Sequence, residues 1–158
     1  MKRLLCALLC LFLLCGCASK EQRITCGELS LTLPSHFRDL SAQPYAEDVE
    51  LLYGAGDVCI SATCESKPAL VALIPQIDAQ MYAQLFLQSN ALPGVVETAD
   101  GIPCFTYSVG SGDTQITYLC GVFESESCFW LVQAYCPDAH FAENRQELWR
   151  YICTATIS

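Results

Sequence analysis

Cysteine is the residue type in this chain with the widest chemical options. The 158-residue sequence contains 12 cysteines but only 2 histidines. A thiol can form a disulfide, ligate a metal as a thiolate, or act as a nucleophile beside a base. Eight cysteines lie beyond residue 20, each inside an apolar segment: Cys26, Cys59, Cys64, Cys104, Cys120, Cys128, Cys136 and Cys153. Their spacing and their neighbours decide which of these reactions the sequence favours.

The cysteine spacing does not indicate a metal site. Structural zinc sites combine two short steps of the Cys-x2–4-Cys or His-x3–5-His type. Cys59 and Cys64 enclose four residues, and no second pair of similar spacing accompanies them. Asp138 and His140 stand two residues apart, so a helix would direct them to different faces and they would not form a catalytic dyad. The sequence has no nucleophile elbow, phosphate loop or dinucleotide fingerprint. We therefore predict no catalytic residue, no metal and no cofactor.

The N-terminal segment has the pattern of a secretory signal. Met1-Lys2-Arg3 is followed by an unbroken apolar run of 11 residues, Leu4 to Leu14. A transmembrane helix needs about 20 apolar residues to cross a core of about 30 Å, and this run is too short. An ordinary signal peptidase prefers small residues at both −1 and −3. Cleavage after Gly16 would place Leu14 at −3, which fits that enzyme poorly.

The residues Leu14-Cys15-Gly16-Cys17 resemble the lipobox of bacterial lipoproteins. The resemblance implies that the Cys17 thiol receives a diacylglycerol thioether and that a dedicated peptidase cuts after Gly16. One acyl chain binds a membrane only marginally, but a diacylglycerol supplies two chains on one residue. We therefore predict a signal peptide over residues 1–16, a lipidated tether over 17–23 and a single globular domain over 24–158. Cys17 would hold this domain on the extracytoplasmic face of a bacterial cell membrane.

The role of the eight domain cysteines stays open between two interpretations. An even number of cysteines in an exported domain is typical of a disulfide framework. A buried free cysteine, however, behaves as a small hydrophobic residue. The predicted signal peptide itself carries Cys6, Cys10 and Cys15 where Leu or Ala would serve. The sequence is compatible with mostly free core thiols and with one or two bridges.

The charge balance limits the classes of partner. Without residues 1–16 the chain keeps 6 basic and 17 acidic residues, a net charge of −11. Nucleic-acid binding depends on Lys and Arg neutralising phosphates, so this balance argues against it. The same balance disfavours electrostatic docking of the whole domain on an anionic lipid surface. The remaining 142 residues have the length of one domain.

Periodicity predicts a strand-rich α+β domain. Pro34 ends the first strand, Gly54-Ala55-Gly56 and Asp100-Gly101 are hairpin signals, and Ile77, Met81 and Leu85 follow a helical period. The predicted strands are 24–33, 49–53, 58–64, 95–98, 102–109, 115–123 and 128–136, and the first predicted helix is 76–89.

The last predicted hairpin and the closing helix give more specific expectations. A two-residue loop at Ser125-Glu126 would place Phe123 opposite Cys128, with no two cysteines facing each other. Pro137-Asp138 is a helix start. In the predicted helix 137–151, the spacing of Phe141, Leu148 and Ile152 directs these three side chains to the sheet and leaves Trp149 at the margin of the apolar stripe.

Several of these segments resemble the PsbP-like superfamily, which includes DcrB-type bacterial lipoproteins and photosynthetic extrinsic proteins. The resemblance rests on the opening segment Gly27 to Phe37, on Phe105-Thr106-Tyr107, on Trp130-Leu131-Val132 and on the helix that ends in Tyr151-Ile152-Cys153-Thr154. It implies an antiparallel β-sheet flanked by helices, an α-β-α sandwich. Members of that superfamily are mainly accessory or binding proteins.

Two functions from different classes follow from these observations. The first is a membrane-tethered accessory or protein-interaction module that contacts another envelope protein. The second is a binder of a small apolar or peptide ligand, in a pocket between sheet and helix lined by the aromatic residues Tyr82, Phe86, Tyr107 and Trp130. A contiguous exposed apolar patch would favour the first function, and an enclosed cavity would favour the second.

Overall fold

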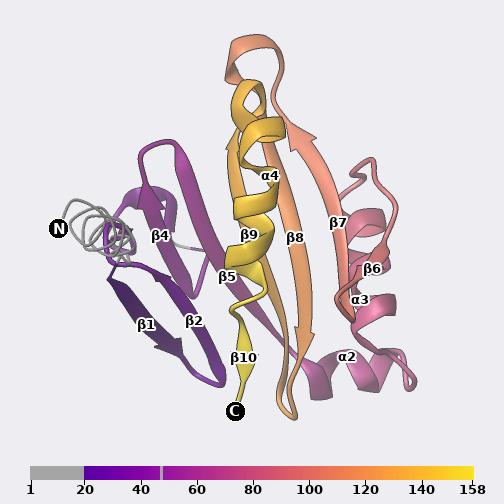
Figure 1. Ribbon diagram of the computed structural model, residues 1–158. Coiled ribbons are helices and arrows are strands. Elements are labelled where there is room, and N and C mark those ends of the chain that lie inside the picture. Colours follow the sequence, from indigo (N-terminus) through magenta and orange to yellow (C-terminus); the bar gives the residue numbers. More distant parts are fainter. Residues whose placement is uncertain (1–19, 47) are drawn as a thin grey trace, which may run out of the picture.

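The computed structural model describes residues 20–46 and 48–158 (Figure 1). The predicted signal peptide and Cys17 lie outside these described residues. The elements are β1 (Glu21–Cys26), β2 (Leu29–Pro34), β3 (Arg38–Asp39), η1 (Pro44–Ala46), β4 (Leu51–Ala55), β5 (Val58–Ser66), α2 (Lys67–Leu73), α3 (Ala79–Ser89), β6 (Glu97–Ala99), β7 (Ile102–Val109), η2 (Gly112–Thr114), β8 (Ile116–Glu124), β9 (Cys128–Pro137), α4 (Asp138–Ile152) and β10 (Thr156–Ile157). None of the described helices is long and apolar enough to span a membrane.

A seven-stranded antiparallel sheet forms the centre of the fold, in the order β3-β4-β5-β9-β8-β7-β6. One of its faces packs against α4 and the other against α3 (Figure 1). The predicted α-β-α sandwich is therefore confirmed. A small three-stranded sheet, β1-β2-β10, was not predicted and shares the α4 face of the large sheet.

Each face of the large sheet has its own hydrophobic core. β9 contributes to both, because successive side chains of a strand point to opposite faces. Its Trp130 and Val132 face α4, and its Phe129 and Leu131 face α3. The central strand is consequently buried along most of its length.

The first predicted strand is in fact a hairpin. Gly27 adopts a positive φ of 55°, which glycine reaches without strain, and the chain reverses at Gly27-Glu28 so that Cys26 pairs with Leu29. β2 then buries Leu29, Leu31 and Leu33 against the α4 face. β1 begins at Glu21, so the last three residues of the predicted tether belong to the folded domain.

Of two hairpin turns predicted from glycine-containing sequences, one forms at the predicted residues and the other is displaced along the chain. The Asp100-Gly101 turn forms as predicted, with positive φ at both residues (52° and 80°), as a two-residue turn of this type requires. The other predicted turn is displaced: Ala55 pairs with Val58, and the loop is Gly56-Asp57. Gly54 lies inside β4, where a Cβ atom would come within 2.7 Å of the Leu40 side chain.

The β8–β9 hairpin has a longer loop than predicted. Phe123 pairs with Trp130 and not with Cys128, a shift of two residues. The Ser125 hydroxyl accepts a hydrogen bond from the Cys128 amide at 2.8 Å, and the Ser125 amide donates to the Cys128 carbonyl at 2.9 Å, which closes a four-residue loop. A shift of two keeps every side chain on its face. No two cysteines oppose each other in this hairpin, as predicted.

The helices agree with the sequence pattern except for one. α3 begins three residues later than predicted, where the Asp78 carboxylate accepts a hydrogen bond from the Met81 amide at 2.8 Å and caps the helix. α4 starts and ends within one residue of its predicted limits. α2, which begins with Pro68 in its first turn, was not predicted.

All eight domain cysteines are free thiols in the structure. Cys104, Cys120 and Cys136 are buried, four others are half-buried and Cys153 is exposed. Burial raises the pKa of the Cys120 thiol, which keeps it protonated at neutral pH. This arrangement favours the interpretation of core thiols for most of the set, with Cys153 as an exception.

We expect alkylation of the denatured protein, without any reductant, to modify most of the eight domain thiols. The physical reason is that a thiol without a disulfide partner becomes accessible as soon as the core opens. Peptide mass mapping before and after reduction measures the modified fraction at each cysteine. Four mapped bridges would contradict the core-thiol interpretation and would make the fold depend on crosslinks worth about 2–4 kcal/mol each.

Candidate functional site

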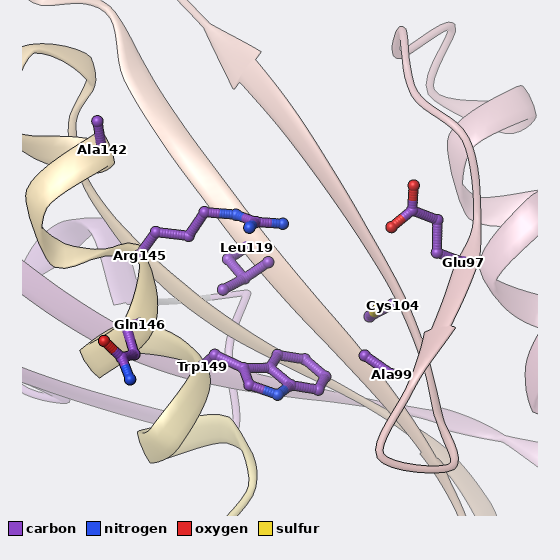
Figure 2. Close-up of a pocket in the computed structure, with 8 residues that line it drawn as sticks. All are labelled: Glu97, Ala99, Cys104, Leu119, Ala142, Arg145, Gln146 and Trp149. Atoms are coloured by element: carbon purple, nitrogen blue, oxygen red, sulfur yellow. The ribbon is translucent and has the colours of Figure 1, made fainter.

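A groove runs between α4 and the β6–β7 hairpin on one face of the large sheet (Figure 2). Its volume is about 430 Å³. It is lined by Ala142, Arg145, Gln146 and Trp149 of α4, Glu97 and Ala99 of β6, Cys104 of β7 and Leu119 of β8. A second hollow of about 220 Å³ shares four of these residues and extends the groove towards Val95, whose side chain is 76% exposed.

Helical spacing explains why α4 can form one wall of this groove. The lining residues Ala142, Arg145, Gln146 and Trp149 recur at intervals of three and four residues, so they share one face. The adjacent face of α4 buries Leu148 and Ile152 completely in the core. Because the helix packs mainly over β8 and β9, the sheet beyond it at β7 and β6 forms the floor and the opposite wall.

The close approach of α4 to the sheet depends on a glycine. A Cβ atom at Gly121 would lie 2.6 Å from the Ile152 side chain. Any larger residue at this position of β8 would push the C-terminal end of α4 away from the sheet. Gly121 therefore determines how closely α4 approaches the sheet, and with it the position of the groove wall that α4 forms.

Trp149 is held in place by the opposite hairpin. Its indole N–H donates to the Asp100 carboxylate at 2.8 Å, and the Cys153 thiol lies 4.0 Å from the same carboxylate oxygen. Asp100 occupies the turn between β6 and β7 and reaches the helix from there. The predicted position of Trp149, at the margin of the apolar stripe, is confirmed, since its side chain is half-buried.

The charged groups of the groove stand on facing walls. The Arg145 guanidinium extends from α4 across Leu119, and the Glu97 carboxylate projects from β6 on the other side (Figure 2). Among the described residues, Arg145 forms no ion pair within 4.0 Å and no side-chain hydrogen bond. Burial raises the pKa of the Cys104 thiol, and the Arg145 charge offsets this only in part. The groove thus combines an apolar floor with one cation and one anion that are free to contact a ligand.

The two histidines lie elsewhere. His36 is exposed and its ring contacts Phe37, with ring centroids 5.3 Å apart. His140 bonds to the Asp57 carboxylate, whereas Asp138 accepts a hydrogen bond from Thr117. As predicted, Asp138 and His140 do not meet. Within residues 20–46 and 48–158, no cluster of three or more His, Cys, Asp or Glu side chains could hold a metal ion.

The predicted aromatic pocket is wrong. Tyr82 and Phe86 of α3 pack with Tyr107 in the core between α3 and the sheet. Trp130 lies in the core between α4 and the other face of the sheet. These side chains fill space and do not line it: Tyr82 stacks on Phe129 with ring centroids 5.1 Å apart. The groove residues were missed because β6, β7 and α4 are far apart in sequence. The marginal position of Trp149 was the one local signal of the groove.

An antiparallel sheet between helical layers, closed by a C-terminal helix, defines the fold as an α-β-α sandwich. A solved structure similar to this chain is cyanobacterial PsbP (CyanoP) from Synechocystis sp. PCC 6803, with a TM-score of 0.62 and 13% identity over 91% of this chain and 97% of that one. A Bacteroides thetaiotaomicron protein has a TM-score of 0.51 and 11% identity over 89% of this chain and 48% of that one, so this chain spans about half of its length.

LpqN of Mycobacterium tuberculosis, described as involved in cell envelope biogenesis, has a TM-score of 0.46 and 16% identity over 88% of this chain and 91% of that one. No protein-family model and no curated protein match the sequence. At these identities the likeness shows the fold alone. The function has to be argued from the chain itself.

Proposed function

We propose that this protein is a lipid-anchored accessory module on the extracytoplasmic face of a bacterial membrane, which contacts an envelope protein through the α4 groove. The proposed lipid anchor is supported by the tetrapeptide Leu14-Cys15-Gly16-Cys17, which begins at the last residue of the 11-residue apolar run. Thioether lipidation of Cys17 would leave the folded domain, which begins at Glu21, close to the bilayer.

The groove is the contact surface because of its residue types. Trp and Arg are enriched among the residues that dominate binding energy at protein interfaces. Trp149 presents a half-buried indole that is already oriented by Asp100, so little side-chain freedom is lost on binding. Arg145 presents a guanidinium that has no carboxylate partner in the described part of the chain. Together they offer one aromatic anchor and one charged anchor on the same helix face.

A second candidate function is the binding of a small ligand or peptide in the same groove. The observation in its favour is the volume of about 430 Å³, which lies within the range of about 300–1,000 Å³ that is usual for ligand pockets. The two functions differ in what native membranes would yield. If the protein is an accessory module, a specific protein should copurify with it. If it is a ligand carrier, a small molecule should copurify with it and be released by organic extraction.

We expect the double variant Arg145→Gln/Trp149→Ala to lose about 30-fold or more in affinity for its partner, because one hot-spot residue contributes about 2 kcal/mol or more and each 1.4 kcal/mol is about tenfold. The measurement is affinity purification of the lipidated protein from native membranes, with quantitative mass spectrometry. Arg150→Gln is the matched control, since Arg150 is exposed on α4, where it pairs with Glu147 across one turn and lies over the Tyr151 ring. An unchanged protein partner in the double variant would exclude the groove as its contact surface.

A further inference from the structure

The basic residues of the domain are unevenly distributed. Beyond residue 16 the chain has six Lys and Arg residues, and three of them, Lys20, Arg23 and Arg38, fall within a segment of 19 residues. The backbone amide of Ser35 donates to the Lys20 carbonyl at 2.7 Å, which joins the start of β1 to the segment that leads into β3. Lys20, Arg23 and Arg38 therefore share one end of the molecule, together with exposed His36. We name this set the anchor end.

The fold ties the anchor end together. The Gln22 side-chain amide donates to the carbonyls of Pro34 and Phe37 at 3.2 and 2.8 Å. Arg23 and Arg38 each lie three residues along the chain from the Lys20–Ser35 contact. Three extended residues span at most about 11 Å, so both cations stay within that reach of the contact.

These cations have no partners among the residues that the structure describes. The side chains of Lys20, Arg23 and Arg38 form no ion pair or hydrogen bond with any other described residue. By contrast, Lys67 pairs with Glu124 and Arg150 pairs with Glu147. The three charges at the anchor end are thus available to groups outside the domain.

The rest of the domain has the opposite charge. Within the two segments that flank the Lys20–Ser35 contact, residues 20–23 and 35–39, the three cations are accompanied by two carboxylates, Glu21 and Asp39. Hydrogen bonds from Ser41 hold the pKa of Asp39 below its usual value, so this carboxylate stays ionised. The remaining residues beyond position 16 have three Lys and Arg residues against fifteen acids. The charge is +1 over these two segments and −12 over the other residues beyond position 16.

Chain geometry places the anchor end beside the membrane if Cys17 is lipidated. Lys20 lies three positions after Cys17, and three extended residues span at most about 11 Å. The Debye length is about 8 Å at physiological salt, so charges at this end act on the headgroups while those of the distant body are largely screened. An anionic membrane surface therefore attracts the cations of the anchor end and repels the acidic residues of the rest of the domain.

We infer that the anchor end, through Lys20, Arg23 and Arg38, rests on anionic phospholipid headgroups and orients the domain on the membrane. The inference rests on the proposed lipid anchor. Its consequence concerns the groove: β3 lies at one edge of the seven-stranded sheet and β6 at the other (Figure 1). Six strand spacings of about 4.8 Å separate these edges by about 29 Å. The β6 wall of the groove is then held away from the bilayer, where an envelope partner can reach it.

The test uses the lipidated full chain in vesicles, with the photo-crosslinking residue p-benzoylphenylalanine at exposed Ser35 or at exposed Val95 near the opposite edge. We expect lipid crosslinking at Ser35 to rise several-fold when about 30 mol % phosphatidylglycerol replaces phosphatidylcholine. The rise should disappear at about 1 M salt, where the Debye length falls to about 3 Å. Val95 should crosslink little in either membrane.

Two double variants distinguish the effect of the charges at the anchor end from the effect of the net charge of the domain. Arg23→Gln/Arg38→Gln should abolish the rise at Ser35, whereas Lys67→Gln/Arg150→Gln removes the same charge elsewhere and should preserve it. Equal crosslinking at Ser35 on both membranes, or equal crosslinking at Ser35 and Val95, would overturn the orientation. Flotation with vesicles tests the lipid anchor separately. A chain without lipid on Cys17 should not float with the vesicles, so failure of the proposed anchor is detected before crosslinking is measured.

Discussion

Replacing Cys17 with serine should abolish lipid labelling of this protein and leave the full-length precursor in the cell. The thioether forms on a thiol, which serine lacks, and Cys17 is the one cysteine that follows a Leu-x-Gly sequence. Cleavage of a lipoprotein precursor requires the lipid, so residues 1–16 should remain attached. Metabolic labelling with an alkyne fatty acid, followed by intact-mass measurement, reports both effects as losses close to complete.

Cys15→Ser provides the matched control for this experiment. The substitution removes the neighbouring thiol but keeps a small residue at −2 and leaves Leu14, Gly16 and Cys17 in place. Labelling and processing should therefore continue. Labelling that persists in Cys17→Ser, or that is lost in Cys15→Ser alone, would contradict the assignment of Cys17 as the lipid anchor.

Leu148→Ala should destabilise the domain by about 2–5 kcal/mol, as truncation of a buried leucine does. Leu148 is fully buried between α4 and the sheet, next to Ile152 and Tyr151. The close approach of α4 over Gly121 leaves the helix little freedom to collapse into the cavity that the truncation creates. Urea unfolding, with the slope of the transition checked for constancy, measures the change in the free energy of unfolding.

Trp149→Ala is the comparison for this prediction. Trp149 is half-buried and its main specific interaction is the hydrogen bond to Asp100. The expected loss is about 1–2 kcal/mol, from one hydrogen bond and part of an aromatic surface. An equal loss in both variants would show that Trp149 belongs to the core, and the groove would then not be a preformed surface.

Local signals were sufficient for several elements. Pro137 and Asp138 start α4 within one residue of the predicted position, because proline at a first turn and an acid near the helix dipole act through adjacent backbone groups. Asp100-Gly101 formed the predicted turn for a similar reason, since both residues tolerate positive φ. α2 was missed because its apolar run is short and buries no residue, so it has no distinct amphipathic period.

Other features depended on contacts between distant segments. The β1–β2 hairpin divides a run that alternates like one strand, and it is stabilised by burial of Leu31 and Leu33 against α4. The β8–β9 register was set by the Ser125 hydroxyl and not by the shortest possible loop. The four aromatic residues predicted to share a pocket were divided between two cores, because α3 and β7 place three of them on one face of the sheet, whereas β9 directs Trp130 to the other face.

The sequence by itself determined the α+β class and the apolar stripe of α4, because helical and strand periods and turn residues act over a few neighbouring positions. Its prediction of a lipid-anchor site at Cys17 lies outside the described residues. The tertiary structure alone decided that Arg145 and Trp149 face Glu97 and Ala99 across a groove. It also decided that the Lys20 carbonyl contacts the Ser35 amide, which brings Lys20 and Arg38 to the same end of a domain whose net charge is strongly negative. Such juxtapositions depend on how distant segments pack against each other. A composition gives only the net charge of the chain and not where the charged residues lie in the fold.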